Sequence, residues 1–467
     1  MRTVAAVRSL ASPEAPKDVR AAPVPASRAR RSLGPTLLLF LLVANIAVVT
    51  GLWLQHGGWP GDGSRATVFT AVGQITALWG TLAALVQILL VARVPGLDGR
   101  FGMDRLVRWH RWVGFSLAWF LLAHVIASTI GWAAGDGRGA ISEFLFLNGH
   151  ETSILLATVG FTLLVAVAVT SARASRRALS REAWFMIHLL SYVMMTVSFP
   201  HLVEVGTDFD HHRWTTSYWV LLYAVVVAAL LWHRFGNPVR NTRRHRFVVG
   251  STTAEAPGVI SLRLHAHALD RFPLRAGQFV TVRFLARGWL HRAHPFSVSG
   301  QNGDVLRLTV KALGDDTAKI ADIPVGTRVI VEGPYGAFTE AARTRTKVLL
   351  IAGGIGITPI RLLFERLAGE RGDLTLLYRS SSAADVVFRD ELDAIAHQRG
   401  CDVHYIVGPR SHHRDVFSAS SLTSLVPDVA SHDVYLCGPR SLVASATAGL
   451  VGAGVAPSRI HSEHFAL

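Results

Sequence analysis

Apolar residues gather in six long stretches in the first half of the chain, and short segments that alternate apolar and polar residues follow in the second half. Each stretch is close to the ~20 residues that an α-helix needs to cross the hydrocarbon core of a membrane. The pattern therefore predicts six spanning helices followed by soluble domains. The expected spans lie at about 34–55, 68–92, 105–132, 152–171, 183–203 and 215–234.

Arginine is divided unevenly between the loops that join these spans. One set of loops is rich in arginine, whereas each opposite loop holds a single one. The positive-inside rule then places the rich loops and both termini in the cytoplasm, in a multi-pass protein of the plasma membrane. The rich set contains Arg28, Arg30, Arg31, Arg93, Arg100, Arg105, Arg108, Arg173, Arg176, Arg177 and Arg181, and the poor set contains Arg65, Arg138 and Arg213, with Asp208 and Asp210 nearby.

Composition refines this prediction in three ways. A net charge of +15 suggests nucleic acid, but arginine beside apolar spans explains it, so we expect membrane lipid and no nucleic acid as partner. Residues 1–32 lack the long apolar core of a secretory signal and are expected to form a disordered basic cytoplasmic tail. Two cysteines, Cys401 and Cys437, are too few for a disulfide framework or a four-cysteine iron–sulfur site.

Two of the spans carry a pair of histidines each. His110 and His124 lie in the third span, and His188 and His201 in the fifth. Ionisable side chains are costly inside a membrane, and haem iron can take a histidine on each side. Because both spans rise from the cytoplasm, we expect an inner haem between His110 and His188 and an outer haem between His124 and His201. A hydrogen-bonded core position is the alternative for each histidine alone.

Depth supports this pairing more clearly than angle does. At 1.5 Å per residue, the two histidines of the third span are about 21 Å apart and the two histidines of the fifth span about 20 Å apart. At 100° per residue, His124 returns to within about 40° of His110, but His201 lies about 140° from His188. Pro200 can kink or rewind the fifth helix and restore the facing. Arg108 and Arg111 either pair with haem propionates or extend to lipid headgroups.

After Asn237 and Pro238 the pattern changes to short strands. Segments such as GQFVTVRFL and DVLRLTVKAL predict a small antiparallel barrel at about 241–340. From Lys347 onward, strands alternate with helices, which indicates a parallel sheet with helices on both faces. Gly353, Gly354 and Gly356 follow its first strand, and Thr358 is expected to cap the next helix, whose N-terminus favours a pyrophosphate.

The segments HPFSVSG, GGIGITPI and LCGPR resemble the ferredoxin-NADP reductase superfamily. Together with the four membrane histidines, they make the chain similar to the ferric reductase and NADPH oxidase family of transmembrane flavocytochromes b. The resemblance implies a multi-domain membrane protein with a six-helix haem-binding domain at 33–236, an antiparallel β-barrel FAD domain at 241–340 and an α/β NAD(P)H-binding domain at 346–467. It further implies hydride transfer from NAD(P)H to FAD and single-electron transfer through two b-type haems to an acceptor outside.

The family pattern also implies roles for individual residues. The flavin motif would place Ser297 near flavin N5, Phe296 against the ring system and His294 near the phosphates. A terminal aromatic, here Phe465, would cover the flavin until the nicotinamide displaces it. The implied catalytic residues are Ser297, Cys437 and Phe465, and the implied cofactor-binding residues are His294, Pro295, Phe296, Ser297, Lys311, Gly314, Thr317, Gly353, Gly354, Gly356, Thr358, Gly438 and Pro439.

Two further features bear on the donor and the acceptor. Arg379, followed by Ser380, is placed to contact a 2'-phosphate, which weakly favours NADPH over NADH; a surface charge is the alternative role of Arg379. Animal oxidases carry a histidine one turn beyond the outer ligand, where this chain has Ser128. A ferric chelate is therefore the expected acceptor. The alternatives are a superoxide-producing oxidase, a non-catalytic haem-bearing subunit for a partner protein, and a haem-free anchor for a soluble reductase.

Overall fold

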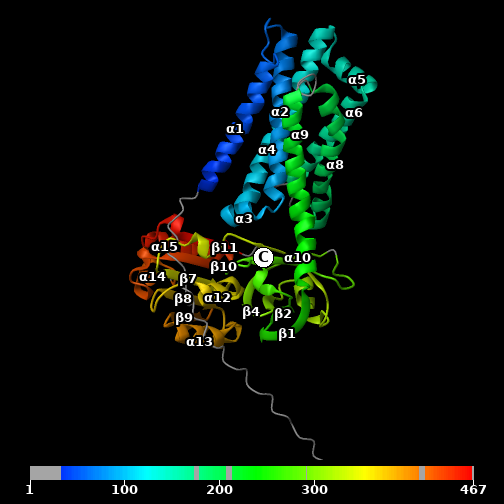
Figure 1. Ribbon diagram of the computed structural model, residues 1–467. Coiled ribbons are helices and arrows are strands. Elements are labelled where there is room, and N and C mark those ends of the chain that lie inside the picture. The colour runs from blue at the N-terminus through cyan, green and yellow to red at the C-terminus, as the bar shows by residue number, and fades with distance from the viewer. Residues whose placement is uncertain (1–32, 173–177, 207–212, 291, 410–415, 465–467) are drawn as a thin grey trace, which may run out of the picture.

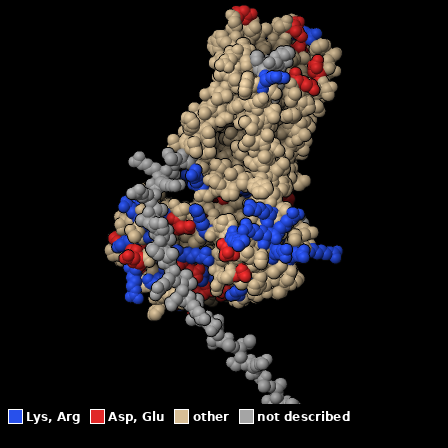
Figure 2. Space-filling model, viewed as in Figure 1, with Lys and Arg blue, Asp and Glu red and all other residues tan. Residues whose placement is uncertain are grey.

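The computed structural model describes residues 33–172, 178–206, 213–290, 292–409 and 416–464. A long helical bundle stands above two soluble lobes (Figure 1). We call residues 248–335 the FAD lobe and residues 348–464 the NAD lobe, after the cofactors that the resemblance implies. The visible surface of the bundle is almost entirely uncharged along its length, whereas the lobes carry many arginines, lysines and carboxylates (Figure 2). The bundle is therefore the membrane domain. The expected basic tail at 1–32 lies outside the described residues.

Six helices of the bundle are long and apolar enough to cross a membrane, which confirms the predicted spans. Two short helices, absent from the prediction, connect spans on opposite sides of the bundle: α3 (Pro95–Phe101) and α5 (Ala140–His150). The spanning helices are α1 (Leu33–Gln55), α2 (Arg65–Val91), α4 (Met103–Asp136), α6 (Thr152–Ser171), α8 (Arg181–Val205) and α9 (Arg213–Leu231).

Helices α2 and α4 pack along each other with glycine at the contacts. A Cβ added to Gly73 would lie 2.2 Å from the Ser128 hydroxyl oxygen, and one added to Gly80 would lie 2.8 Å from a methyl carbon of Leu121. Small residues allow membrane helices to approach this closely. The contacts recur every seven residues on both helices, so they fix the register of α4 against α2.

The FAD lobe is built on one antiparallel sheet with strand order β1-β2-β5-β4-β3-β6. A bridge between Val248, the first residue of edge strand β1, and Arg328, just before edge strand β6, joins the two edges. The antiparallel sheet agrees with the prediction, while a closed barrel stays a prediction. The strands are β1 (Val248–Ala256), β2 (Val259–His265), β3 (Phe279–Phe284), β4 (His294–Asn302), β5 (Val305–Lys311) and β6 (Val329–Tyr335).

The NAD lobe is the predicted parallel sheet, with strand order β11-β10-β7-β8-β9. Along β7, Leu350 joins one apolar core and its neighbours Leu349 and Ile351 join another, because successive side chains point to opposite faces. Both faces are therefore covered. The elements are β7 (Val348–Gly353), α12 (Ile357–Arg366), β8 (Leu374–Ser380), α13 (Arg389–Arg399), β9 (Asp402–Val407), α14 (Ala419–Leu425), β10 (Asp433–Gly438), α15 (Arg440–Gly452) and β11 (Ile460–His464).

Candidate functional site

The structure brings the four membrane histidines together in two facing pairs, one above the other in the bundle. The ring centroids of His110 on α4 and His188 on α8 are 6.0 Å apart. Those of His124 and His201 on the same two helices are also 6.0 Å apart. Helix α8 continues through Pro200 to Val205, and His201 faces His124 despite the 140° expected from an ideal helix.

Backbone carbonyls of α2 orient the two histidines of α4. The His110 Nδ1 lies 3.2 Å from the Gln87 carbonyl oxygen, and the His124 Nδ1 lies 2.9 Å from the Gly73 carbonyl oxygen. Because a carbonyl oxygen only accepts, each Nδ1 carries the hydrogen and donates it. The lone pair of each ring then resides on Nε2, which is the arrangement that metal-ligating histidines adopt.

The partners of the α8 histidines are different. Trp184 stacks on His188 with ring centroids 4.9 Å apart, and the Ser171 hydroxyl oxygen lies 3.5 Å from the His188 Nδ1. The His201 Nδ1 is buried and has no hydrogen-bond partner among the described residues. Protein contacts therefore orient the α4 histidines more firmly than His201.

These pairs fit a haem better than a metal held by the protein alone. Among the described residues, no group of three or more His, Cys, Asp or Glu is placed to hold a metal ion. Two facing imidazoles supply two axial ligands, and a porphyrin would supply the four that remain. With metal–nitrogen distances of ~2.0 Å, as for zinc, two imidazoles on opposite sides of one ion have centroids roughly 6 Å apart.

The flavin motif forms the first half of β4. Ser297 is buried and lies opposite Phe279 of β3, while the rings of His294 and Phe296 are nearly parallel with centroids 5.9 Å apart. Phe296 is only partly buried and packs against the core of the lobe. Residues two apart share one face of a strand. Two aromatic rings therefore stand on the face opposite Ser297, and the exposed Pro295 lies on the Ser297 face.

The nucleotide loop after β7 lies directly against the end of β10. A Cβ added to Gly356 would lie 2.3 Å from the Cys437 carbonyl oxygen, and one added to Gly353 would lie 3.2 Å from Pro439. Gly354 has φ +53°, a backbone conformation that favours glycine. The glycines thus let two motifs, 85 residues apart, meet at the carboxyl ends of neighbouring parallel strands. Ligands bind at such strand ends in open α/β sheets.

Thr358 does not cap α12, so that prediction was wrong. Gly354–Gly356 form a 3₁₀ turn that runs straight into the helix, which begins at Ile357. The Thr358 hydroxyl is buried and donates to the Ile355 carbonyl oxygen, 3.0 Å away, instead of accepting a backbone N–H. The start of α12 consequently has no side-chain cap.

Other cofactor-binding candidates are placed in two loops. The Thr317 hydroxyl accepts hydrogen bonds from the Leu313 and Gly314 amides, which closes the turn after Lys311 at the end of β5. The Arg379 guanidinium donates to the carbonyl oxygens of Ser380, Ile406 and Gly408. Ser380 is itself buried. These contacts reduce the capacity of Arg379 for a 2'-phosphate and leave the choice between NADH and NADPH open.

Sequence reasoning missed Glu463, which lies opposite Cys437 where β11 pairs with β10. Burial, followed by the charges of Asp104 and Asp98, raises the pKa of Glu463 to about 8. Burial also raises the pKa of the Cys437 thiol well above its usual value. Phe465, the predicted aromatic cover of the flavin, lies two residues further on, outside the described residues.

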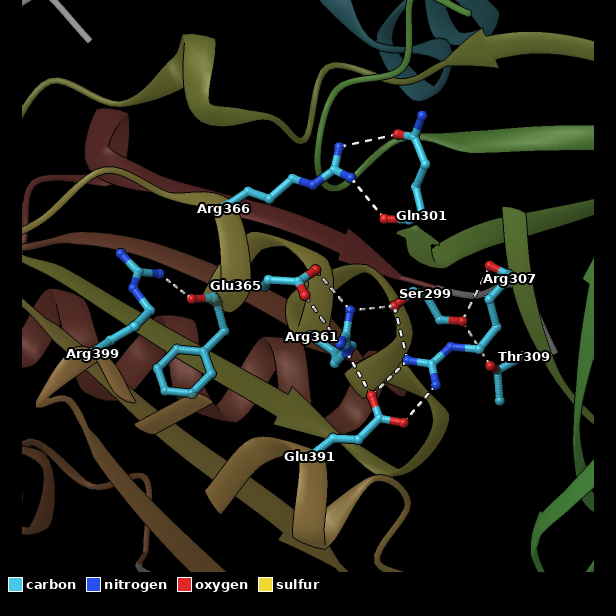
Figure 3. A network of polar contacts seen from close by, with 10 residues as sticks. Ser299, Gln301, Arg307, Thr309, Arg361, Glu365, Arg366, Glu391 and Arg399 are labelled. Atoms are coloured by element: carbon cyan, nitrogen blue, oxygen red, sulfur yellow. Dashed lines mark hydrogen bonds and ion pairs between the residues drawn. The ribbon is translucent and has the colours of Figure 1, made fainter. Parts of the chain in front are cut away.

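A partly buried ion-pair network joins the flavin strand to the helix after the nucleotide loop (Figure 3). Glu391 on α13 accepts hydrogen bonds from Arg307 of β5 at 2.6 and 2.8 Å and from Arg361 of α12 at 2.9 Å. Both arginines also donate to the Ser299 carbonyl oxygen, two residues after Ser297. Arg361 lies three residues after Thr358. The network therefore fixes the flavin strand relative to the helix that follows the nucleotide loop.

A second contact joins the membrane domain to the FAD lobe. Asp98 of α3 is buried, and its carboxylate accepts a 2.8 Å hydrogen bond from the Gly336 amide just beyond β6. Arg93 donates to the Thr281 hydroxyl and lies over the Tyr335 ring, 4.8 Å from its centroid. The loop between the second and third spans thus holds the strand next to β3, which in turn pairs with the flavin strand.

Comparison with protein families identifies the architecture that this geometry suggests. Residues 29–199 match the ferric reductase like transmembrane component, 257–339 an FAD-binding domain and 350–448 an oxidoreductase NAD-binding domain. Together these three matches are the domain architecture of the ferric reductase and NADPH oxidase family. Residues 350–448 therefore form an oxidoreductase NAD-binding domain, in a chain that also has six helices long and apolar enough to cross a membrane.

Similar individual proteins cover only part of the chain. The stachydrine N-demethylase reductase subunit of Rhizobium meliloti is 27% identical over 46% of this chain and 64% of its own length. A flavohemoprotein of Xylella fastidiosa is 28% identical over 47% of this chain and 58% of its own length. The solved FAD/NAD-binding domain of a Vibrio cholerae nitric oxide dioxygenase is 25% identical, with a TM-score of 0.41, and covers 47% of this chain and 98% of that one. The chain spans less than two thirds of either curated relative.

Proposed function

We propose that this protein moves electrons from cytoplasmic NAD(P)H through FAD and two b-type haems to a ferric chelate on the outer face of the plasma membrane. The observation that carries the proposal is the pair of facing histidine couples, each with ring centroids 6.0 Å apart, above the FAD and NAD lobes. The excess of arginine on the lobe side supports a cytoplasmic location of both lobes.

The residues of the chain would bind and orient the cofactors. His110 and His188 would hold the haem nearer the lobes, and His124 and His201 the other one. Ser297 and Phe296 would bind the flavin, and the loop at Gly353 would bind the nicotinamide nucleotide. When bound, FAD would accept hydride from NAD(P)H and donate single electrons to the haems, which are one-electron carriers.

Ser128 supports a ferric chelate over oxygen as the acceptor. It lies one turn beyond His124, and its hydroxyl oxygen is 3.2 Å from the His124 Nδ1. The hydroxyl is therefore engaged with the histidine, and a serine at this position supplies no ionisable group for oxygen chemistry. With histidine on both sides of each iron, reduction of the acceptor would be outer-sphere.

Haem content of the purified chain tests the proposal most directly. We expect two b-type haems per polypeptide, and one in His201→Ala with the flavin still reduced by NADPH. His150→Ala is the matched control, since His150 is exposed at the end of α5. One haem or none in the unaltered chain would refute the proposal.

The acceptor and the rival functions need separate measurements. Membranes given NADPH should form Fe(II) from ferric citrate faster than they form superoxide when the chelate is absent. Superoxide as the main product in both conditions would instead indicate an oxidase. A purified chain whose haem stays oxidised after its flavin is bleached by NADPH would indicate a subunit that needs a partner protein.

A further inference from the structure

The last span does not end where the membrane ends but continues into the FAD lobe. Helix α9 passes through a π-helical turn, Trp232–Gly236, into α10 (Asn237–His245). At the turn, Trp232 and Phe235 are 51% and 64% exposed. Exposed aromatic side chains are typical of the membrane–water interface. The headgroup layer therefore begins close to residues 232–236.

One face of α10 is fixed to the FAD lobe. Pro238 and His245 are buried, and the Asn241 amide donates to the Gly333 carbonyl oxygen at 3.2 Å. The His245 Nδ1 donates to the His267 carbonyl oxygen at 3.0 Å. With contacts on strand β6 and on the loop after β2, and a continuous helix behind it, α10 cannot rotate about its axis. Its opposite face must point away from the lobe.

That opposite face is strongly basic. Arg240, Arg243 and Arg244 are exposed at helical spacing, and Arg246 is exposed just beyond the helix. We call these four residues the basic face of α10. None of them forms an ion pair with a described carboxylate; the ion pairs of the FAD lobe involve Arg275, Arg283 and Arg307 instead. Figure 2 shows arginine and lysine gathered where the uncharged bundle meets the FAD lobe.

The basic face lies at headgroup depth. At 1.5 Å per residue, Arg240 and Arg244 follow Gly236 by about 6 and 12 Å. Each headgroup layer is roughly 5–8 Å thick, and the potential of anionic lipids extends about one Debye length, ~8 Å, beyond it. A guanidinium binds phosphate through paired hydrogen bonds. Both the position and the chemistry match a lipid phosphate.

We propose that the basic face of α10 binds the anionic phospholipid headgroups of the leaflet next to the FAD lobe. Since α10 holds Gly333 and α3 holds Gly336, headgroup binding would fix the same end of β6 against the membrane. Lipid binding by α10 does not depend on haem or on the acceptor. It can therefore be refuted while the proposed function holds, and the proposed function can be refuted while lipid binding holds.

The test compares two spin-labelled lipids around the full chain in phosphatidylcholine bilayers. At about 0.05 M salt we expect spin-labelled phosphatidylglycerol to associate about fivefold or more better than spin-labelled phosphatidylcholine, because one surface arginine contributes about that factor. The preference should fall at about 0.5 M salt. Arg240→Gln with Arg244→Gln should remove most of it, and each single substitution about half.

Two control proteins make the outcome decisive. Arg371→Gln with Arg389→Gln removes the same charge from exposed residues near α13, at the end of the lobes away from the bundle (Figure 1), and should keep the preference. Arg240→Lys with Arg244→Lys keeps the charge and should also keep it. The proposal would be overturned if Arg240→Gln with Arg244→Gln kept the lipid preference of the unaltered chain. It would also be overturned if either control lost as much of that preference as this variant.

Discussion

The His124 Nδ1 lies 2.9 Å from the carbonyl oxygen of Gly73, and no side chain larger than hydrogen fits on that glycine. His110 makes the corresponding contact with the Gln87 carbonyl oxygen at 3.2 Å, 14 residues away on each helix. One register of α2 against α4 therefore orients both histidines. A change in that register would turn both rings together.

We therefore expect Gly73→Ala to impair the site at His124. The new Cβ would lie 2.2 Å from the Ser128 hydroxyl oxygen, so α2 and α4 must separate and the carbonyl must leave His124. The overpacking should cost about 1–3 kcal/mol, and loss of the orienting contact should reduce haem affinity at that pair by about 10–100-fold. The measurement is haem per polypeptide, resolved by redox titration into two components.

Gly51→Ala is the control for this prediction, because a Cβ on Gly51 of α1 would meet no atom within 4 Å. Ser128→Ala in the Gly73→Ala background should restore part of the lost haem, since it removes the closest clash but not the 3.0 Å contact with the Ser128 amide nitrogen. Full haem content in Gly73→Ala would show that the close packing does not orient His124.

The network at Glu391 yields a prediction about the two lobes. Burial pushes the pKa of Glu391 up, but the hydrogen bonds and charges of Arg307 and Arg361 outweigh it and lower the pKa. Glu391→Gln leaves the largely buried Arg307 guanidinium without a carboxylate and Arg361 with Glu365 alone. We expect the free energy of unfolding of the lobes to fall by about 1–3 kcal/mol and flavin reduction by NAD(P)H to slow. Release of flavin fluorescence on heating the full chain measures the first effect.

The matched control is Glu365→Gln, because Glu365 pairs with Arg361 at 2.8 Å on the surface of α12 but does not contact Arg307. It should cost less than about 0.5 kcal/mol. The contribution of Glu391 to the free energy of unfolding should be complete above pH 4.5 and decrease as pH falls through the lowered pKa. The stabilities of Glu391→Gln and Glu365→Gln should therefore converge at low pH. Equal effects of both substitutions at pH 7 would contradict the role given to the network.

Glu463 yields a pH dependence of opposite sign. Its pKa is about 8 in the folded chain and near 4.5 when exposed. Between these values the unfolded state has lost the proton and the folded state keeps it, so the free energy of unfolding falls as pH rises from 4.5 to 8. Glu463→Gln should remove this slope and be more stable than the unaltered chain at pH 8, by roughly 2 kcal/mol after allowance for solvent screening. Parallel stability–pH curves of the two proteins between pH 5 and 8 would count against a buried neutral Glu463.

Local sequence patterns predicted the parts of this protein that depend on periodicity. Six apolar runs became six spanning helices, and the alternation after Lys347 became a parallel sheet. Helix geometry alone gave the wrong facing for His201, because it treats α8 as an ideal isolated helix. Thr358 was misassigned because the glycine turn leads directly into α12, which begins one residue before Thr358.

The remaining contacts join residues far apart in the sequence, and periodicity carries no information about them. Glu391 meets Arg307 across 84 positions, and Asp98 meets Gly336 across 238. Glu463 gave one usable signal, a carboxylate in the last strand shortly before the predicted aromatic cover. Its burial depends on the packing of β11 against β10, which no local pattern shows.

The contact between Asp98 and Gly336 sets where the FAD lobe sits beneath the histidine pairs. Asp98→Ala removes the 2.8 Å hydrogen bond, whereas Asp98→Asn keeps an oxygen acceptor for the Gly336 amide and removes the charge whose burial raises the Asp98 pKa. A displacement of ~1 Å can slow a reaction that depends on alignment by up to about 100-fold. We therefore expect the step from reduced flavin to haem to slow by about tenfold or more in Asp98→Ala and to stay within about twofold in Asp98→Asn, with flavin reduction by NADPH unchanged in both. Stopped-flow absorbance at the flavin and haem bands separates the two steps. Slower flavin reduction in Asp98→Ala would mean that α3 supports the lobe as a whole, and equal haem reduction in both variants would mean that this contact does not position the flavin.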